Sequence, residues 1–151
     1  MTVRATVICD ASWCPTSRAG GWAVWINVNY PDGRHERIKD SGNFRTRPRG
    51  SEHAEQVACM IGIFLAVQKG AERLLVQNDC LNVVRTRGST ASPRKRAEYL
   101  EAEEKYWPHL RGCIEWRHVK GHTAGDDSRT WVNNWCDTEA KRHMRKQRNA
   151  T

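Results

Sequence analysis

Residues 3–10, Val3-Arg4-Ala5-Thr6-Val7-Ile8-Cys9-Asp10, are mostly apolar or β-branched and predict a strand. Because successive side chains of a strand point to opposite faces, the odd-numbered residues share one face and Thr6, Ile8 and Asp10 share the other. Apolar side chains on both faces indicate a central strand that is covered on both sides. We expect the rest of the chain to be arranged around this strand.

This predicted strand ends at an acidic residue, Asp10. Burying a charge is costly unless something compensates it, and a metal ion is one such compensation. Asp10 could instead cap a turn into Ala11-Ser12. On this residue alone, the metal and the turn interpretations carry equal weight.

Length and charge restrict the class of protein. A chain of 151 residues predicts a single domain over 1–151, with a basic C-terminal tail from about residue 141. Lys and Arg total 25 against 17 Asp and Glu, and the net charge of +8 favours an anionic partner, nucleic acid first; the alternative is that the charge serves solubility alone. No segment approaches the roughly 20 apolar residues of a membrane span, and no signal-peptide pattern is present, so we expect a cytoplasmic protein without a membrane partner.

The six cysteines are scattered and form no C-x-x-C pair, which argues against a zinc site and predicts that most of them are free thiols, with any buried cysteine packing as a small hydrophobic residue. The remaining pattern predicts, in chain order, strands at 21–30 and 34–44, a helix at 54–67 with Ser51 as its N-cap, a strand at 73–79, helices at 81–87 and 97–110, a strand at 112–119 and a helix from 129 to about 146. The helix at 54–67 is apolar nearly all round, which predicts that it is buried, and Gly62 within it predicts close packing against a neighbour.

Four acidic residues are predicted to meet at one end of the sheet. The helix between the third and fourth strands forms a crossover, so the first and fourth strands should pair in parallel and bring Asp10 and Asp79 side by side. Glu55 and Asp137 come from helices that can pack over the same end. Clustered carboxylates repel one another unless cations lie between them, and oxygen ligands without a Cys or His cage favour Mg²⁺ or Mn²⁺. Two such ions about 3.5–4 Å apart would support phosphodiester cleavage.

Six short motifs follow one another along the chain: Asp10-Ala11-Ser12, Gly20-Gly21, Glu55-Gln56-Val57-Ala58, Asn78-Asp79-Cys80, Val119-Lys120-Gly121-His122 and Asn133-Asn134-Trp135-Cys136-Asp137. In this order and spacing the chain resembles the type 1 ribonuclease H family over nearly its whole length. The resemblance implies an α/β, ribonuclease H-like fold with a five-stranded mixed sheet of order 3-2-1-4-5 and helices on both faces. It also implies a monomeric endonuclease that cuts the RNA strand of RNA–DNA hybrids and leaves 5′-phosphate and 3′-hydroxyl ends.

The resemblance also implies roles for single residues. Asp10, Glu55, Asp79 and Asp137 would ligate two Mg²⁺ ions, for which Mn²⁺ can substitute, and His122 would assist proton transfer or product release. Without the family context, a structural role for His122 in its loop would be favoured over a catalytic one. Glu52 is a rival for Glu55, but only Glu55 keeps the Glu-x-x-Ala register of the family.

Substrate contacts are predicted at Ser12, Trp13, Ser51, Arg94, Lys95, Arg96, Lys120 and Asn133. Trp13 is expected in an exposed turn, where its ring could stack on a sugar or base or could simply pack. The cluster Arg94-Lys95-Arg96 could grip the DNA strand or form a solvated face.

Two departures from the family pattern keep other functions open. The Thr-Asn-Asn that usually precedes the glutamate helix is replaced by Gly50-Ser51-Glu52, and the Asn-Pro-Gly of the first turn is missing. A protein distinguishes RNA from DNA at the 2′-hydroxyl. The sequence therefore supports the metal site more strongly than it supports cleavage of the RNA strand. A DNA nuclease or junction resolvase of the same fold is therefore one alternative, and a non-catalytic module that binds hybrid or DNA is another, although four acids would hinder simple binding of phosphates.

Overall fold

The computed structural model describes residues 2–86, 93–119 and 128–150. Its elements are β1 (Arg4–Trp13), β2 (Gly20–Asn29), β3 (His35–Asn43), α1 (Ser51–Gln68), β4 (Arg73–Asn78), α2 (Leu81–Thr86), α3 (Pro93–Tyr106), the 3₁₀ turn η1 (Pro108–Leu110), β5 (Ile114–His118) and α4 (Ser128–Arg148). Among the described residues, no helix combines the length and the apolar composition that crossing a membrane requires.

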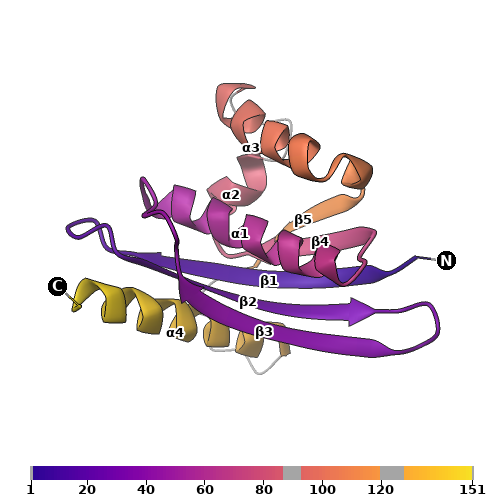
Figure 1. The fold of residues 1–151 in the computed structure, drawn as a ribbon, viewed down its shortest axis with the longest axis horizontal. Helices are drawn as coiled ribbons and strands as arrows, with labels where there is room; N and C mark the ends of the chain where they lie inside the picture. The colour runs from indigo at the N-terminus through magenta and orange to yellow at the C-terminus, as the bar shows by residue number, and fades with distance from the viewer. Residues whose placement is uncertain (1, 87–92, 120–127, 151) are drawn as a thin grey trace.

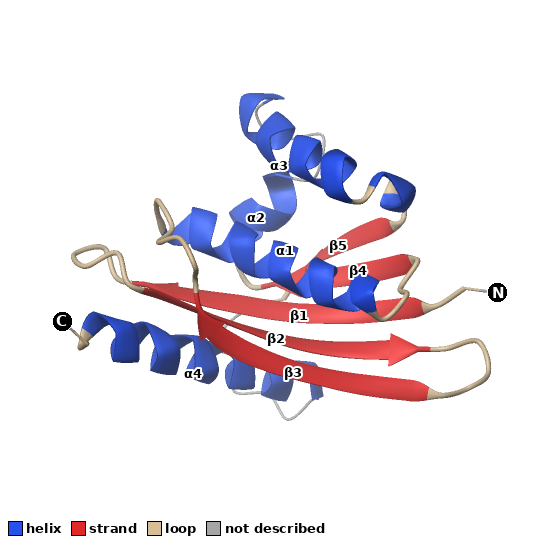
Figure 2. Cartoon of the chain, viewed as in Figure 1, coloured by secondary structure: helices blue, strands red, loops and turns tan. Residues whose placement is uncertain are grey.

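The five strands form one mixed sheet with the order β3-β2-β1-β4-β5. The first three strands pair antiparallel, whereas β4 pairs in parallel with β1 and with β5. Helix α1 covers one face of the sheet and α4 covers the other (Figure 1, Figure 2). The strand order and the two covered faces confirm the prediction from the sequence.

The two faces of β1 enter different cores, as the alternation of its side chains predicts. Ala5, Val7 and Cys9 belong to the larger core beneath α1. Ile8 belongs to a second core beneath α4, which also contains Trp25. Asp10 lies two residues after Ile8, so its side chain is on the same face of the sheet, near the end of the β1–β4 pair.

β1 extends further than the sequence predicts, and this corrects the turn expected after Asp10. The strand pairs with β2 as far as Trp13, opposite Gly20. Its parallel pairing with β4 ends earlier, at Ile8 opposite Gln77. The turn is absent because the antiparallel ladder with β2 continues past Asp10. Trp13 is the last residue of β1 and does not lie in a loop.

Three helix boundaries also differ from prediction. Helix α1 begins at Ser51, and its N-cap is Gly50 without a side-chain cap bond, so Ser51 is not the cap. Helix α3 begins at Pro93 and ends at Tyr106, and a separate 3₁₀ turn begins at Pro108. A proline lacks the backbone N–H that would continue the α-helical pattern, which is why the helix predicted at 97–110 is divided.

The prediction that α1 is buried all round is wrong, because only one face of it packs on the sheet. Phe64 is 50% exposed, whereas Ala58 and Ile63 are fully buried. Gly62 lies on the buried face, and a Cβ atom there would stand 2.5 Å from Cγ1 of Val7. This contact confirms the close packing predicted at the glycine.

Candidate active site

Among the described residues, three acidic side chains converge where the β1–β4 pair ends. Asp10 comes from β1, Glu55 from the second turn of α1, and Asp79 directly follows β4. Carboxylate oxygens from the three residues lie within 4.8 Å of one another. Asp10 is 2% exposed and Glu55 is 7% exposed, so two of the three acids are held inside the protein.

The surroundings of these acids disfavour negative charge. Burial, followed by the charges of Asp79 and Asp137, raises the pKa of Asp10 well above its usual value. Burial, followed by the charges of Asp10 and Asp79, raises the pKa of Glu55 in the same way. These shifts follow from the cost of crowding carboxylates in a poorly solvated place.

Two oxygen atoms of the cluster have no backbone donor among the described residues. Asp10 Oδ1 accepts from the backbone N–H of Ala11 at 2.9 Å, whereas Asp10 Oδ2 and Glu55 Oε1 are buried without such a donor, and the two carboxyl groups interact with each other. Buried polar atoms normally have partners, and acceptors without a donor point to something that belongs there. Hard oxygen donors without thiol or imidazole suit a divalent cation such as Mg²⁺, so the residues present fit the expected metal.

Asp137 lies beside this cluster and is not part of it. Its charge raises the pKa of Asp10, which places it within electrostatic range. Its Oδ2 atom forms an ion pair with Nζ of Lys141, one turn later in α4, at 3.0 Å. The structure thus brings together three of the four predicted ligands, whereas the fourth, Asp137, is paired with Lys141.

Asn78 joins the two strands that carry Asp10 and Asp79, and the sequence predicted no role for it. It is fully buried, its amide nitrogen donates to the carbonyl of Cys9 at 3.0 Å, and its Oδ1 accepts from the N–H of Cys80 at 2.8 Å. These bonds hold the neighbours of both aspartates just beyond the last β1–β4 pair. The only sequence signal for it was its place inside Asn78-Asp79-Cys80.

β5 supports the chain at Asp79 from the other side. The backbone N–H of Val119 donates to the carbonyl of Asn78 at 3.0 Å, and Nε2 of His118 lies 3.0 Å from the carbonyl oxygen of Asp79. The backbone around Asp79 is therefore restrained from both neighbouring strands, although Asp79 itself lies outside the sheet.

Thiol groups pack behind the acids. The Sγ atoms of Cys9 and Cys59 are 3.1 Å apart in the core, and Cys136 Sγ donates to the carbonyl of Ile8 at 3.7 Å. Burial, followed by neighbouring negative charges, raises the pKa of Cys136 well above its usual value, so the thiol stays neutral. All six cysteines are free, as predicted.

The structure separates Glu52 from Glu55. Glu52 lies in the first turn of α1, in a depression that Arg49, Ser51 and Glu98 also line, and Glu55 faces Asp10 one turn later. Ser51 is exposed there. Arg49 forms an ion pair with Glu98 at 2.6 Å, which links this end of α1 to α3.

The other predicted substrate contacts fall in different surroundings. Ser12 and Trp13 are partly buried, and the indole N–H of Trp13 donates to the carbonyl of Pro48 at 3.1 Å. Asn133 is 2% exposed, so it lies inside the protein, one turn before Asp137, and not on a surface open to a substrate. Arg94 is exposed in the first turn of α3.

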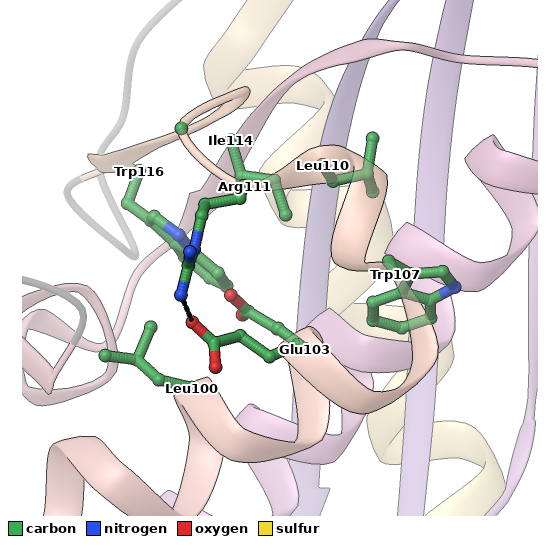
Figure 3. A pocket seen from close by; sticks show the side chains of 9 residues that line it. Leu100, Glu103, Trp107, Leu110, Arg111, Ile114 and Trp116 are labelled. Atoms are coloured by element: carbon green, nitrogen blue, oxygen red, sulfur yellow. Dashed lines mark hydrogen bonds and ion pairs between the residues drawn. The ribbon is translucent and has the colours of Figure 1, made fainter.

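The remaining predicted residues cannot be placed. Lys120 and His122 lie outside the described residues, and of Lys95 and Arg96 only the helical backbone is described. A pocket between α3 and β5, lined by residues such as Trp107, Leu110 and Trp116, contains none of the predicted site residues (Figure 3). The acid cluster is therefore the candidate site.

Comparisons with known proteins support the fold. No protein-family model and no curated protein matches the chain. Among solved structures, the N-terminal RNase H domain of Rv2228c from Mycobacterium tuberculosis is 19% identical, with a TM-score of 0.63, over 99% of this chain and 100% of that one. RNase H1 from the archaeon Halobacterium salinarum is 18% identical, with a TM-score of 0.61, over 95% and 98%. LC11-RNase H1 in complex with an RNA/DNA hybrid is 12% identical, with a TM-score of 0.60, over 95% and 98%. The chain thus has the fold of type 1 ribonuclease H.

Proposed function

We propose that the chain is a type 1 ribonuclease H, a metal-dependent endonuclease that hydrolyses the RNA strand of RNA–DNA hybrids. The observation that carries the proposal is the cluster of Asp10, Glu55 and Asp79, with two buried carboxylate oxygens that lack a backbone donor, in this fold. The products are expected to carry 5′-phosphate and 3′-hydroxyl ends. The positive net charge of +8 favours a polyanionic substrate of this kind.

Each residue of the site has a role in this proposal. Asp10, Glu55 and Asp79 would hold Mg²⁺, and Asp137 would complete the set if a cation displaces Lys141 from its carboxylate. When bound, two divalent ions would supply an activated water and stabilise the leaving oxygen. Asn78 keeps the two strands that carry Asp10 and Asp79 in register. His122 is proposed to move a proton or to assist product release from its loop.

Cleavage assays with purified protein test this function. Labelled RNA–DNA hybrid, duplex RNA, duplex DNA and a four-way DNA junction should be incubated with Mg²⁺, and only the RNA strand of the hybrid is expected to be cut. Asp10→Asn should abolish cleavage, whereas Asp40→Asn, the same change at an exposed position on β3, should leave it intact. Cleavage that persists in Asp10→Asn, or in excess chelator, would contradict the metal mechanism.

One observation keeps a DNA nuclease as a second candidate. At the start of α1, where the family pattern has amide side chains, Ser51 and Glu52 line a depression together with the ion pair of Arg49 and Glu98. Hydroxyl and charged groups would therefore face the 2′-hydroxyls there in place of amides. Cleavage of the DNA junction, together with an uncut hybrid, would favour this candidate.

A further inference from the structure

A second pocket opens on the α4 side of the sheet, and none of the described residues that line it is acidic. It measures about 630 Å³, which lies within the usual range for small-molecule sites. Its floor comes from β1, β2 and β4, and one wall comes from the first turn of α4. It begins at Ile8 and extends away from Asp10 toward Thr6.

The floor of this pocket contains a polar group that is buried and unpaired. Gln77 is 3% exposed, and its Oε1 atom has no hydrogen-bond partner among the described residues. It lies beside Ile8 in the sheet, and the partly buried side chains of Thr6 and Asn27 form the next row. A buried carbonyl oxygen without a partner is costly, so this pocket suits a ligand that donates a hydrogen bond.

Cations surround the pocket on two sides. Arg37 on β3 and Arg129 at the start of α4 are both exposed and line it. Neither arginine forms an ion pair with a described residue. Arg117 pairs in register with Gln77 from β5 and so shares its face. Because a guanidinium group matches the geometry of a phosphate, these side chains favour a phosphate group on the ligand.

Aromatic rings complete the pocket. Trp131 is 58% exposed and meets Trp25 edge to face, with ring centroids 5.4 Å apart. The guanidinium carbon of Arg37 lies 4.9 Å from the Trp25 ring centroid. An exposed indole beside cations is a platform on which a nucleobase can stack.

We propose that this pocket binds a nucleoside phosphate. The base would stack on Trp131 and donate a hydrogen bond to Gln77, and the phosphate would contact Arg37 and Arg129. Such a ligand is available as a free nucleotide or as an unpaired nucleotide at the end of a nucleic acid. The inference does not depend on the cleavage activity, because the acid cluster does not line this pocket.

Titration of ¹⁵N-labelled protein with adenosine 5′-monophosphate tests the proposal. The experiment is done in chelator, so that the carboxylates repel phosphate and the acid cluster does not bind the nucleotide through a metal. Saturable shifts are expected for the indole N–H signals of Trp25 and Trp131, with Trp131→Phe assigning the second. Adenosine alone and inorganic phosphate alone should each bind more weakly than the nucleotide.

Variants identify the groups that bind. Arg37→Ala combined with Arg129→Ala should weaken the affinity roughly tenfold or more, and Gln77→Leu should weaken it about 3–10-fold. The matched control, Arg145→Ala with Lys146→Ala, removes the same charge from the other end of α4 and should leave the affinity unchanged. Absence of saturable shifts, or equal weakening by the control pair, would overturn the proposal.

The same protein distinguishes the two sources of the ligand. A hybrid with a short single-stranded adenine tail is compared with a blunt hybrid in chelator. Tighter binding of the tailed hybrid that disappears in the double arginine variant identifies the end of a strand as the ligand. Equal binding of the two hybrids, with the nucleotide titration positive, identifies the free nucleotide.

Discussion

At the scale of single residues, Asp10 is buried beside other carboxylates, and no described cationic side chain forms an ion pair with it. Its pKa in the folded state is raised by burial and by Asp79 and Asp137 above the ordinary value of 3.8. A carboxyl group of this kind stabilises the fold while it is protonated, below its unfolded pKa. That contribution is lost as pH rises through the folded pKa.

We therefore expect the protein in chelator to lose thermal stability as the pH rises above the unfolded pKa of Asp10, and Asp10→Asn to lose less over the same range. Each kcal/mol of unfolding free energy that is lost should lower the melting temperature by about 2–4 °C. Added Mg²⁺ should raise the melting temperature of the parent more than that of the variant. Parallel pH profiles for the two proteins would contradict this account of the acid cluster.

Asn78 offers a test of positioning. Asn78→Ala removes the side-chain bonds to Cys9 and to Cys80 and should destabilise the fold by about 1–3 kcal/mol. It should also raise the Mg²⁺ concentration needed for half-maximal cleavage, because the two aspartates lose their common restraint. Asn29→Ala, at the exposed end of β2, is the control for both measurements. A loss of stability with an unchanged Mg²⁺ requirement would assign Asn78 to folding alone.

At this scale the sequence predicts the acidic residues of the cluster but not Asn78, which holds their neighbours in place. Asp10, Glu55 and Asp79 were identifiable because carboxylates in apolar surroundings are unusual and their motifs are known. Asn78 and Gln77 were not, since an amide in a strand becomes informative only when its buried partners, or their absence, are visible. Asn133 was placed at the substrate from its motif, but its burial depends on how α4 packs.

At the scale of elements, the pairing of α1 with β1 depends on Gly62. Gly62→Ala would place a Cβ atom 2.5 Å from Cγ1 of Val7, and overpacking of this kind should cost about 1–3 kcal/mol in unfolding free energy. Combining it with Val7→Ala should recover part of the loss, which denaturant unfolding of the two single variants and the double variant would measure. Gly50→Ala, where a Cβ atom meets nothing within 4 Å, should lose only the small contribution of glycine at the N-cap of α1 and no packing energy. Additive losses in the double variant would place the strain elsewhere.

The sequence predicted the existence and type of every helix and strand that the structure describes, apart from the 3₁₀ turn η1 (Pro108–Leu110), which was expected to be part of α3. It predicted the ends of β2, β4 and α2 to within one residue, but not the end of β1, the start of α1 or either end of α3. β1 continues past Asp10 because β2 remains paired with it, and this is a tertiary effect that no local pattern reports. The exposed side of α1 was missed for the same reason, since an apolar run does not say which of its residues a neighbour covers.

At the scale of the whole molecule, topology was the most predictable feature. A helix between β3 and β4 requires a crossover, and the crossover places β4 beside β1. The same rule predicts from the sequence alone that Asp79 lies beside Asp10. Charge was predictable in amount, +8, but its distribution around the pocket of Gln77 required the sheet register.

The net charge of +8 leads to a prediction about binding. Lys and Arg side chains that bind phosphates release condensed counterions, so affinity for the hybrid should fall steeply with salt. Arg94, Lys95 and Arg96 lie in the first turns of α3, and Arg94 is exposed there. If they grip the substrate, replacing all three by Ala should flatten the plot of log affinity against log salt by about 0.9 for each phosphate that the variant no longer binds.

The measurement uses the Asp10→Asn background, in which the hybrid should stay uncut. Its control replaces Arg4, Arg34 and Arg73, three exposed arginines at the end of the sheet opposite Asp10, where Arg4 and Arg73 are paired in register. This control removes the same charge from the molecule, so any general effect of net charge appears in both triple variants. A smaller slope in the α3 variant alone places the hybrid against α3, because only direct binding of phosphates releases counterions at a site. An equal slope in the two variants would make the α3 cluster a solvated face.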